Sequence, residues 1–249
     1  MLLHVLATAG VLTTKQLQCL IPTSVRSLRR YYHDYLIDHR TAPLALKQFG
    51  LQQVYQELRL YSLGSVGRAW LDWQGVTYPT YEGYAMMQLT HDVLCNEVIM
   101  ALIEMLGQHD KSPSWYGKQE AQLWSVDSKE QTCILEPDGL LIAKGRDSRA
   151  WTIEFHNENH RNRAAEKVAR YERVARSGQW RTAWPLDAFP IVLIVSHKKA
   201  VMDGYADALA EQRRRGLACT YLGKPLQHIL DRKQLDRWVD LSSGQAVQL

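Results

Sequence analysis

The chain has 249 residues, of which 46% are hydrophobic and 22% are charged. This composition is that of a globular protein with a substantial core, and the length suits one large domain or a small domain joined to a medium one. The net charge of +4 permits an anionic partner without requiring one. No apolar run approaches the roughly 20 residues that span a membrane, no Cys-x-x-Cys pair occurs, and the pattern of residues 2–11 does not predict a signal peptide. We therefore expect a cytoplasmic protein that does not enter membranes.

The N-terminal 40 residues predict three short helices. An apolar stripe indicates the first helix over residues 2–9, and capping segments predict two more at about 14–20 and 24–37. In the third helix, four apolar or aromatic residues recur at three- and four-residue intervals, so we expect them to face the core. They are Val25, Leu28, Tyr32 and Tyr35.

Basic side chains occupy another face of the third predicted helix. They are Arg26, Arg29, Arg30 and His33. A helix-turn-helix with arginines on the exposed face of its last helix is how a recognition helix meets the major groove, so these four are candidates for contact with double-stranded DNA. Two other interpretations stay open, a helical bundle with a solvated basic face and a winged helix that binds protein.

Residues 47–63 predict the wing of such a domain. They are interpreted as two short strands around Gly50, the second of which partly alternates polar and apolar residues. A closing helix is expected to start at about residue 64. Residues 1–75 are thus predicted to form a winged helix-turn-helix domain.

Residues 74–83 contain glycine and proline and predict a linker to a second domain, residues 84–249. A long helix is expected first, at 84–106. Strands are then predicted at 117–126, 132–143 and 150–156, a helix at 161–176, a buried strand at 189–196, a helix at 202–215 and a final strand at 217–222. A mixed sheet flanked by helices buries these elements, so the fold class is α/β (α+β).

Two carboxylates stand out in the second domain. Asp138 lies in a Pro-Asp-Gly segment that interrupts an apolar stretch, and Glu154 shares one face of a predicted strand with Thr152 and His156. If the two strands are neighbours, Asp138 and Glu154 lie side by side and offer the oxygen ligands that Mg²⁺ needs to orient a phosphodiester. The alternative interpretation is a plain hairpin turn at Asp138 and a solvated strand face at Glu154.

Basic residues follow these carboxylates closely. Arg161 and Arg163 begin the helix predicted at 161–176, and Lys167 and Tyr171 are four residues apart on one of its faces. Such a strip suits a DNA backbone. The alternative is a solvated helix face, with Lys167 an ordinary surface lysine.

The order of the motifs resembles the replication-relaxation family of plasmids and other mobile elements. The matching segments are Tyr61-Ser62-Leu63-Gly64-Ser65-Val66-Gly67, His91 with Asn96, Pro137-Asp138-Gly139, Glu154 with His156, and Lys167 with Tyr171. The second domain is also similar to the PD-(D/E)xK nuclease superfamily. That resemblance implies a restriction-endonuclease-like sheet in which Asp138 and Glu154 bind Mg²⁺, with Glu97 as a further carboxylate and Glu120 as a weaker alternative.

One position departs from the superfamily pattern. His156 stands where a lysine is expected two residues after the glutamate, and a histidine lacks the fixed charge of a lysine near neutral pH. Lys167 could supply that charge from the helix. The resemblance therefore leaves two functions open, a Mg²⁺-dependent DNA endonuclease and a non-enzymatic regulator or replication or transfer accessory factor. Its implied partners are double-stranded DNA, other mobile-element proteins and a second copy of the chain in a homodimer.

Overall fold

The computed structural model describes residues 1–42, 44–49, 58–81, 86–107, 113–125, 132–144, 148–156 and 162–249. The chain forms two compact units, Met1–Met100 and Ala101–Leu249. The boundary lies inside a helix, α5 (Met86–Gly107), later in the chain than the linker predicted at residues 74–83. The mixed α/β class expected from the sequence is confirmed. No described helix is both long and apolar enough to cross a membrane.

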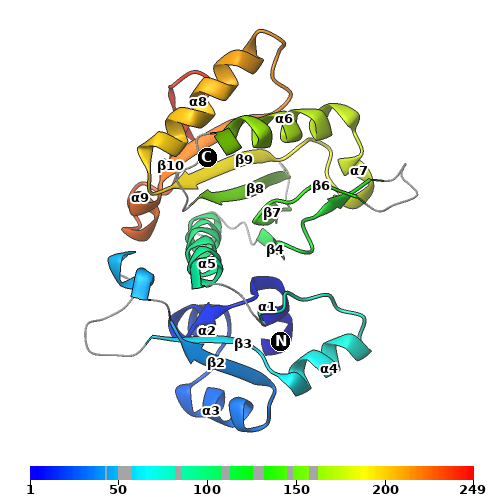
Figure 1. The fold of residues 1–249 in the computed structure, drawn as a ribbon, viewed down its shortest axis with the longest axis vertical. Helices are drawn as coiled ribbons and strands as arrows, with labels where there is room; N and C mark the ends of the chain where they lie inside the picture. The colour runs from blue at the N-terminus through cyan, green and yellow to red at the C-terminus, as the bar shows by residue number, and fades with distance from the viewer. Residues whose placement is uncertain are drawn as a thin grey trace. The chain divides into compact units, whose positions relative to one another are not determined.

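The first unit alternates short helices with the strands of a small antiparallel sheet (Figure 1). Its elements are α1 (Leu2–Ala9), β1 (Leu12–Thr13), α2 (Thr14–Leu20), α3 (Val25–His33), β2 (Ile37–Thr41), the 3₁₀ helix η1 (Leu44–Phe49), β3 (Arg59–Leu63), α4 (Ser65–Trp73) and the first part of α5. The strand order is β1-β3-β2. Wholly buried leucine and isoleucine side chains from these elements form the core.

Local chemistry sets the limits of these helices. Thr13 caps α2 by accepting a hydrogen bond from the Gln16 backbone N–H, while the Gln16 side chain accepts one from the Thr13 N–H. Ser24 caps α3 in the same way through the Ser27 N–H. The Gln16 side chain also donates to the Val93 carbonyl at 3.1 Å, which attaches α2 to α5 within this unit.

Three expectations for the first unit were wrong. The third helix ends at His33 rather than near Ile37, and Ile37–Thr41 is strand β2. Residues 47–49 belong to η1 rather than to a strand, so the hairpin of this unit is made by β2 and β3; the predicted Gly50 turn lies outside the described residues. Of the four residues expected to face the core from the third helix, only Leu28 is buried. Val25, Tyr32 and Tyr35 are exposed.

The second unit is built on a seven-stranded mixed sheet of order β12-β11-β10-β9-β8-β7-β4 (Figure 1). Its strands are β4 (Pro113–Gly117), β7 (Gly139–Ala143), β8 (Arg149–His156), β9 (Ile191–Ser196), β10 (Tyr221–Pro225), β11 (Arg237–Asp240) and β12 (Ala246–Gln248). The β8–β9 and β9–β10 pairs are parallel, and the others are antiparallel. A separate pair, β5 (Leu123–Trp124) and β6 (Cys133–Leu135), lies outside this sheet.

Helices α6 (Asn162–Ser177) and α8 (Lys199–Arg213) cover one face of the sheet (Figure 1). Apolar residues of α6, among them Val168 and Tyr171, are buried in one core with strand residues of β7, β8 and β9. Two short helices, α7 (Trp180–Ala183) and α9 (Leu226–Leu230), complete the unit.

Some strands of this unit lie where the sequence predicts them, and others do not. The strand expected at 150–156 is β8, and the one expected at 189–196 contains β9. The strand expected at 117–126 was wrong. The segment that pairs with β7 in the main sheet is Pro113–Gly117, which ends where the expected strand was to begin. The segment 132–143 is two strands, β6 and β7, since Pro137 breaks it. The final strand starts at Tyr221 rather than at residue 217.

Candidate functional site

Asp138 and Glu154 lie together at one end of two paired strands. Gly139 of β7 is opposite Ile153 of β8, and Asp138 immediately precedes that pair. The Asp138 backbone N–H donates to the Ile153 carbonyl at 3.0 Å, and its Oδ2 accepts from the Phe155 N–H at 2.8 Å. The Pro-Asp-Gly segment therefore lies at the end of the β7–β8 pairing that is away from the connection between the two strands. Its hydrogen bonds hold the Asp138 carboxylate beside β8.

Glu154 is fully buried on the sheet face that α6 covers, so the interpretation of a solvated strand face is wrong. Tyr171 Oη donates to Glu154 Oε1 at 2.7 Å, and Lys167 Nζ donates to Glu154 Oε2. Lys167 and Tyr171 are four residues apart on α6, so one helical face supplies both donors. The expected approach of Lys167 to the acidic pair is present in the structure, and Lys167 is not a solvated surface lysine.

The charges of this carboxylate–lysine cluster (Asp138, Glu154, Lys167 and Tyr171) depend on one another. Burial raises the pKa of Glu154, the neighbouring Lys167 ammonium opposes that rise, and the Asp138 carboxylate adds to it. Burial acts to lower the pKa of Lys167, but the Glu154 and Asp138 carboxylates outweigh it and the net direction is upward. Burial and the nearby Glu154 raise the pKa of Tyr171 well above its ordinary range, so Tyr171 stays a neutral donor.

His156 extends this cluster toward α8. Its Nε2 is hydrogen-bonded to Tyr205 Oη at 2.7 Å, and the two ring centroids are 5.4 Å apart. Burial, followed by the Glu154 and Asp138 charges, raises the pKa of Tyr205 well above its ordinary range. Sequence reasoning missed Tyr205, because α8 follows β8 by more than 40 residues and no local pattern connects the two.

The donor set of this cluster differs from the one that Mg²⁺ requires. Mg²⁺ takes six oxygen ligands at short distances and keeps several waters around one or two carboxylates. Here both oxygens of Glu154 already accept hydrogen bonds, and its side chain has no exposed surface. Among the described residues, no group of three or more His, Cys, Asp and Glu side chains is placed to hold a metal. The cluster as it stands therefore does not fit the magnesium site implied by the resemblance.

The remaining predicted carboxylates lie elsewhere. Glu97 is buried in the first unit, where its Oε1 accepts from Gln16 Nε2 at 3.0 Å. Glu120, the weaker alternative, accepts from the Gly117 N–H at 2.9 Å and so closes the turn after β4. These contacts give each side chain a structural partner within its own unit.

The basic residues predicted for DNA contact are exposed where the structure describes them. Arg26, Arg29, Arg30 and His33 are all exposed on α3, and Arg163 is exposed at the start of α6. Arg161 lies outside the described residues. Among the described residues, Arg26 and Arg29 have no ion-pair partner, while the Arg30 guanidinium lies 5.4 Å from the centre of the Tyr31 ring.

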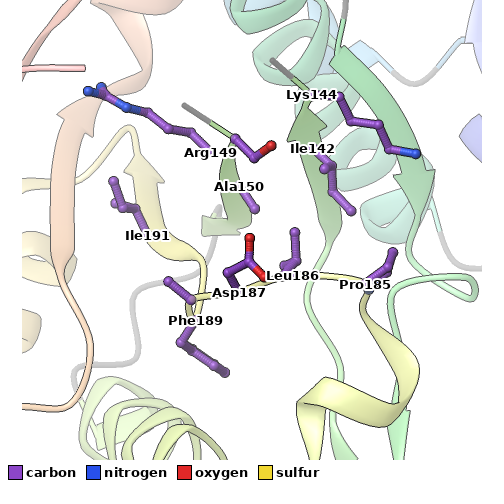
Figure 2. A pocket seen from close by; sticks show the side chains of 11 residues that line it. Ile142, Lys144, Arg149, Ala150, Pro185, Leu186, Asp187, Phe189 and Ile191 are labelled. Carbon is purple, nitrogen blue, oxygen red and sulfur yellow. The ribbon is translucent and has the colours of Figure 1, made fainter. Parts of the chain in front are cut away.

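A pocket of about 420 Å³ lies at the opposite ends of β7 and β8 from the carboxylate–lysine cluster. Its wall is mainly apolar, with Ile142, Phe189 and Ile191 among the lining residues. Figure 2 shows that the two cationic side chains at its rim, Lys144 and Arg149, extend away from each other. Because these charges do not converge, the pocket offers no focused anion site and stands apart from the cluster.

The fold and the site define an α/β protein in which a small unit carrying a basic helix is joined to a mixed sheet with a buried carboxylate–lysine cluster. The model of one family, replication-relaxation, matches residues 3–185, which is most of the chain. The chain therefore belongs to the replication-relaxation family, which connects it with replication and with mobile elements. No curated protein and no solved structure matches the chain.

Proposed function

We propose that this protein binds double-stranded DNA through its first unit and acts as an accessory factor in the replication of a mobile element. The observation that carries the proposal is the character of α3. This helix buries a single side chain, Leu28, and exposes three arginines and a histidine. A helix that contributes so little to the core is suited to enter the major groove of a duplex.

The order of elements supports a winged helix-turn-helix. Helix, strand, helix, helix and strand follow one another from α1 to β2, and β3 comes after the 3₁₀ helix η1; β1 joins the β2–β3 hairpin at the edge of β3. In such a domain α3 is the recognition helix and the β2–β3 hairpin is the wing. The wing adjoins α3 in the sequence, because only three residues separate His33 from Ile37.

The charge on α3 favours an anionic partner. No acidic residue occurs within Val25–His33, so the arginines are not neutralised along their own helix. Phosphate contacts release condensed counterions, so binding through these arginines is expected to weaken steeply with salt.

We propose that the second unit contributes by binding rather than by cutting. Its order β4-β7-β8-β9, with α6 between the parallel strands β8 and β9, supports the similarity to the PD-(D/E)xK fold. However, the Lys167 ammonium forms an ion pair with the Glu154 carboxylate, which is the group that a metal would need as a ligand. This contact favours the non-enzymatic accessory factor over the Mg²⁺-dependent endonuclease.

Binding of a labelled 30-base-pair duplex over a range of salt concentrations tests the first part of the proposal. We expect Arg26→Ala/Arg30→Ala to weaken binding at least about tenfold and to make the slope of log K against log salt shallower by about 2, roughly one per lost phosphate contact. Arg214→Ala/Arg215→Ala removes the same charge from exposed positions of the second unit and is the matched control. Equal losses in the two variants would contradict the role of α3.

Incubation of supercoiled plasmid with Mg²⁺ or Mn²⁺ tests the second part. We expect the protein to bind the plasmid without nicking it. Cleavage by the wild type that Glu154→Gln and Asp138→Asn both abolish would overturn the accessory role and would show that Lys167 releases Glu154 when metal and DNA are present.

A further inference from the structure

Helix α3 ends in a way that is unusual for a tyrosine. The Leu36 N–H donates to the Tyr31 carbonyl and the Tyr35 N–H to the Tyr32 carbonyl, both at 3.0 Å, which is the hydrogen-bond pattern of a Schellman motif. In this motif the residue at the position of Tyr35 takes a left-handed conformation and is usually glycine. Tyr35 has φ 56°, where its β-carbon makes the conformation costly.

The backbone around Tyr35 is held firmly by the start of α4. The Tyr35 carbonyl accepts from the Val66 N–H at 3.0 Å and from the Gly67 N–H at 3.4 Å. A Cβ at Gly64 would lie 2.4 Å from the Tyr35 carbonyl oxygen, so only glycine permits this approach. The turn is therefore well fixed, and it presents a side chain that is 67% exposed.

The Tyr35 side chain contributes little to the folded unit. Among the described residues it has neither a hydrogen bond nor a ring contact. Glycine would form the same turn with less strain. A tyrosine that costs stability, makes no hydrogen bond or ring contact among the described residues and is 67% exposed is suited to an external partner.

Tyr32, one turn earlier, is exposed as well and its ring is held in place. It packs on His39 of β2 with the ring centroids 4.2 Å apart, and His39 lies against Tyr61 of β3. We call Tyr32 and Tyr35 the tyrosine end of α3. The three arginines lie before this end along the same helix, so flat aromatic surfaces adjoin a cationic one.

We propose that the tyrosine end of α3 stacks on unpaired bases, so that the first unit prefers DNA containing an unpaired segment to a fully paired duplex. This inference rests on the proposed DNA binding and names the class of DNA. Aromatic side chains bind single strands by stacking on base faces, which the neighbouring pairs cover inside a duplex. The arginines of α3 would hold the adjoining backbone.

Charge at this end of the helix argues for bases over phosphates. The C-terminus of a helix carries partial negative charge, and the exposed carboxylates of Asp34 and Asp38 follow directly. Arg30 and His33 offset this negative charge within the last turn of α3, so a phosphate is disfavoured only beyond His33, around Tyr35, where the neutral face of a base is not. The arginines of α3 therefore suit the phosphates of a nucleic acid, and the tyrosine end suits its bases.

The test compares two labelled 30-base-pair DNAs, one fully paired and one with six central mismatched pairs. We expect the wild-type full-length protein to bind the mismatched DNA at least about fivefold more tightly. Tyr35→Gly should abolish that preference and leave binding to the paired duplex within about twofold, with a melting temperature no lower than that of the wild type. Tyr35→Phe should keep the preference, because the ring remains. Trp73→Ala, which removes an exposed aromatic side chain of α4, is the matched control and should change neither affinity.

The outcomes separate this inference from the proposal on which it rests. Tight binding of both DNAs with equal affinity, unaffected by Tyr35→Gly, would overturn the stacking role and leave duplex binding intact. Equal weakening of both by Tyr35→Gly would also overturn it, since the tyrosine would then contact the duplex itself. Binding of neither DNA by the wild type would remove the proposed function together with the inference.

Discussion

Glu154 has no exposed surface, and its ion pair with Lys167 offsets the free energy that burial of its charge costs. Removing a charge from water costs several kcal/mol, and a buried pair offsets this cost only while both partners are present. Lys167→Met would leave the carboxylate buried with Tyr171 as its remaining donor. We expect this variant to lose about 3 kcal/mol of the free energy of unfolding near pH 8.

The loss should depend on pH in a definite direction. Without the ammonium, the pKa of Glu154 in the folded protein rises further above its ordinary value of 4.5. A carboxyl group whose pKa is raised by folding contributes stability below its unfolded pKa and loses it as the pH increases. Urea unfolding from pH 4 to 8 should therefore show a small difference between wild type and Lys167→Met at pH 4 that widens toward pH 8. In the Glu154→Gln background, the effect of Lys167→Met should change much less with pH, because Asp138 is then the one carboxylate of the cluster left to interact with the ammonium. A constant difference in both backgrounds would argue against the pairing.

The sequence predicted the main parts of this cluster because they follow periodic rules. Alternation placed Glu154 with Thr152 on one strand face, and the four-residue spacing placed Lys167 with Tyr171 on one helical face. Burial of Glu154 could not be read from the strand alone, since Thr152, Glu154 and His156 are also what a solvated face would contain. Glu154 is buried because helix α6 covers this face of the sheet, which is a tertiary contact.

At the scale of elements, the junction between α3 and α4 depends on a close approach of two backbones. A Cβ at Gly67 would lie 2.1 Å from the Leu36 carbonyl oxygen, and that atom belongs to backbone that cannot move aside cheaply. We expect Gly67→Ala to lower the free energy of unfolding by more than about 2 kcal/mol, as overpacking against rigid atoms does.

Gly107 is the matched control for this substitution. It is the last residue of α5, and a Cβ there meets no atom within 4 Å. Gly107→Ala should be neutral or stabilise the protein by up to about 1 kcal/mol, since alanine loses less backbone freedom in a helix. Thermal unfolding followed by circular dichroism compares the two, and similar melting temperatures for both variants would contradict a close contact at Gly67.

The errors at this scale have a common physical cause. Strand β2 has the sequence Ile-Asp-His-Arg-Thr and buries only Ile37, so its alternation is too weak to be distinguished from the end of a helix. The segment 113–117 enters the sheet through its pairing with β7, and nothing local requires it. Strands set by tertiary pairing are not visible in the periodicity of their own residues.

At the scale of the molecule, the division of the chain follows contacts that the linker composition does not reveal. The segment 74–83 has the glycine and proline of a linker, but the first unit extends through Met100. The first part of α5 is bound to α1 and α2 by buried side chains. Asn96 Nδ2 donates to the Ala9 and Val11 carbonyls at 3.0 and 2.8 Å, and Gln16 donates to the Val93 carbonyl and to Glu97.

These contacts predict how fragments of the chain behave. A fragment of residues 1–83 would keep all of α1 to α4 but would leave the Gln16 amide and the Val11 carbonyl without their α5 partners and would expose the core they cover. Each such loss costs about 1–3 kcal/mol, which is a large part of the stability of a unit this small. We expect residues 1–100 to unfold cooperatively and residues 1–83 to show no cooperative transition, as measured by urea unfolding and amide hydrogen exchange. If both fragments unfolded at the same urea concentration, the first unit would end at the linker and α5 would belong to the second.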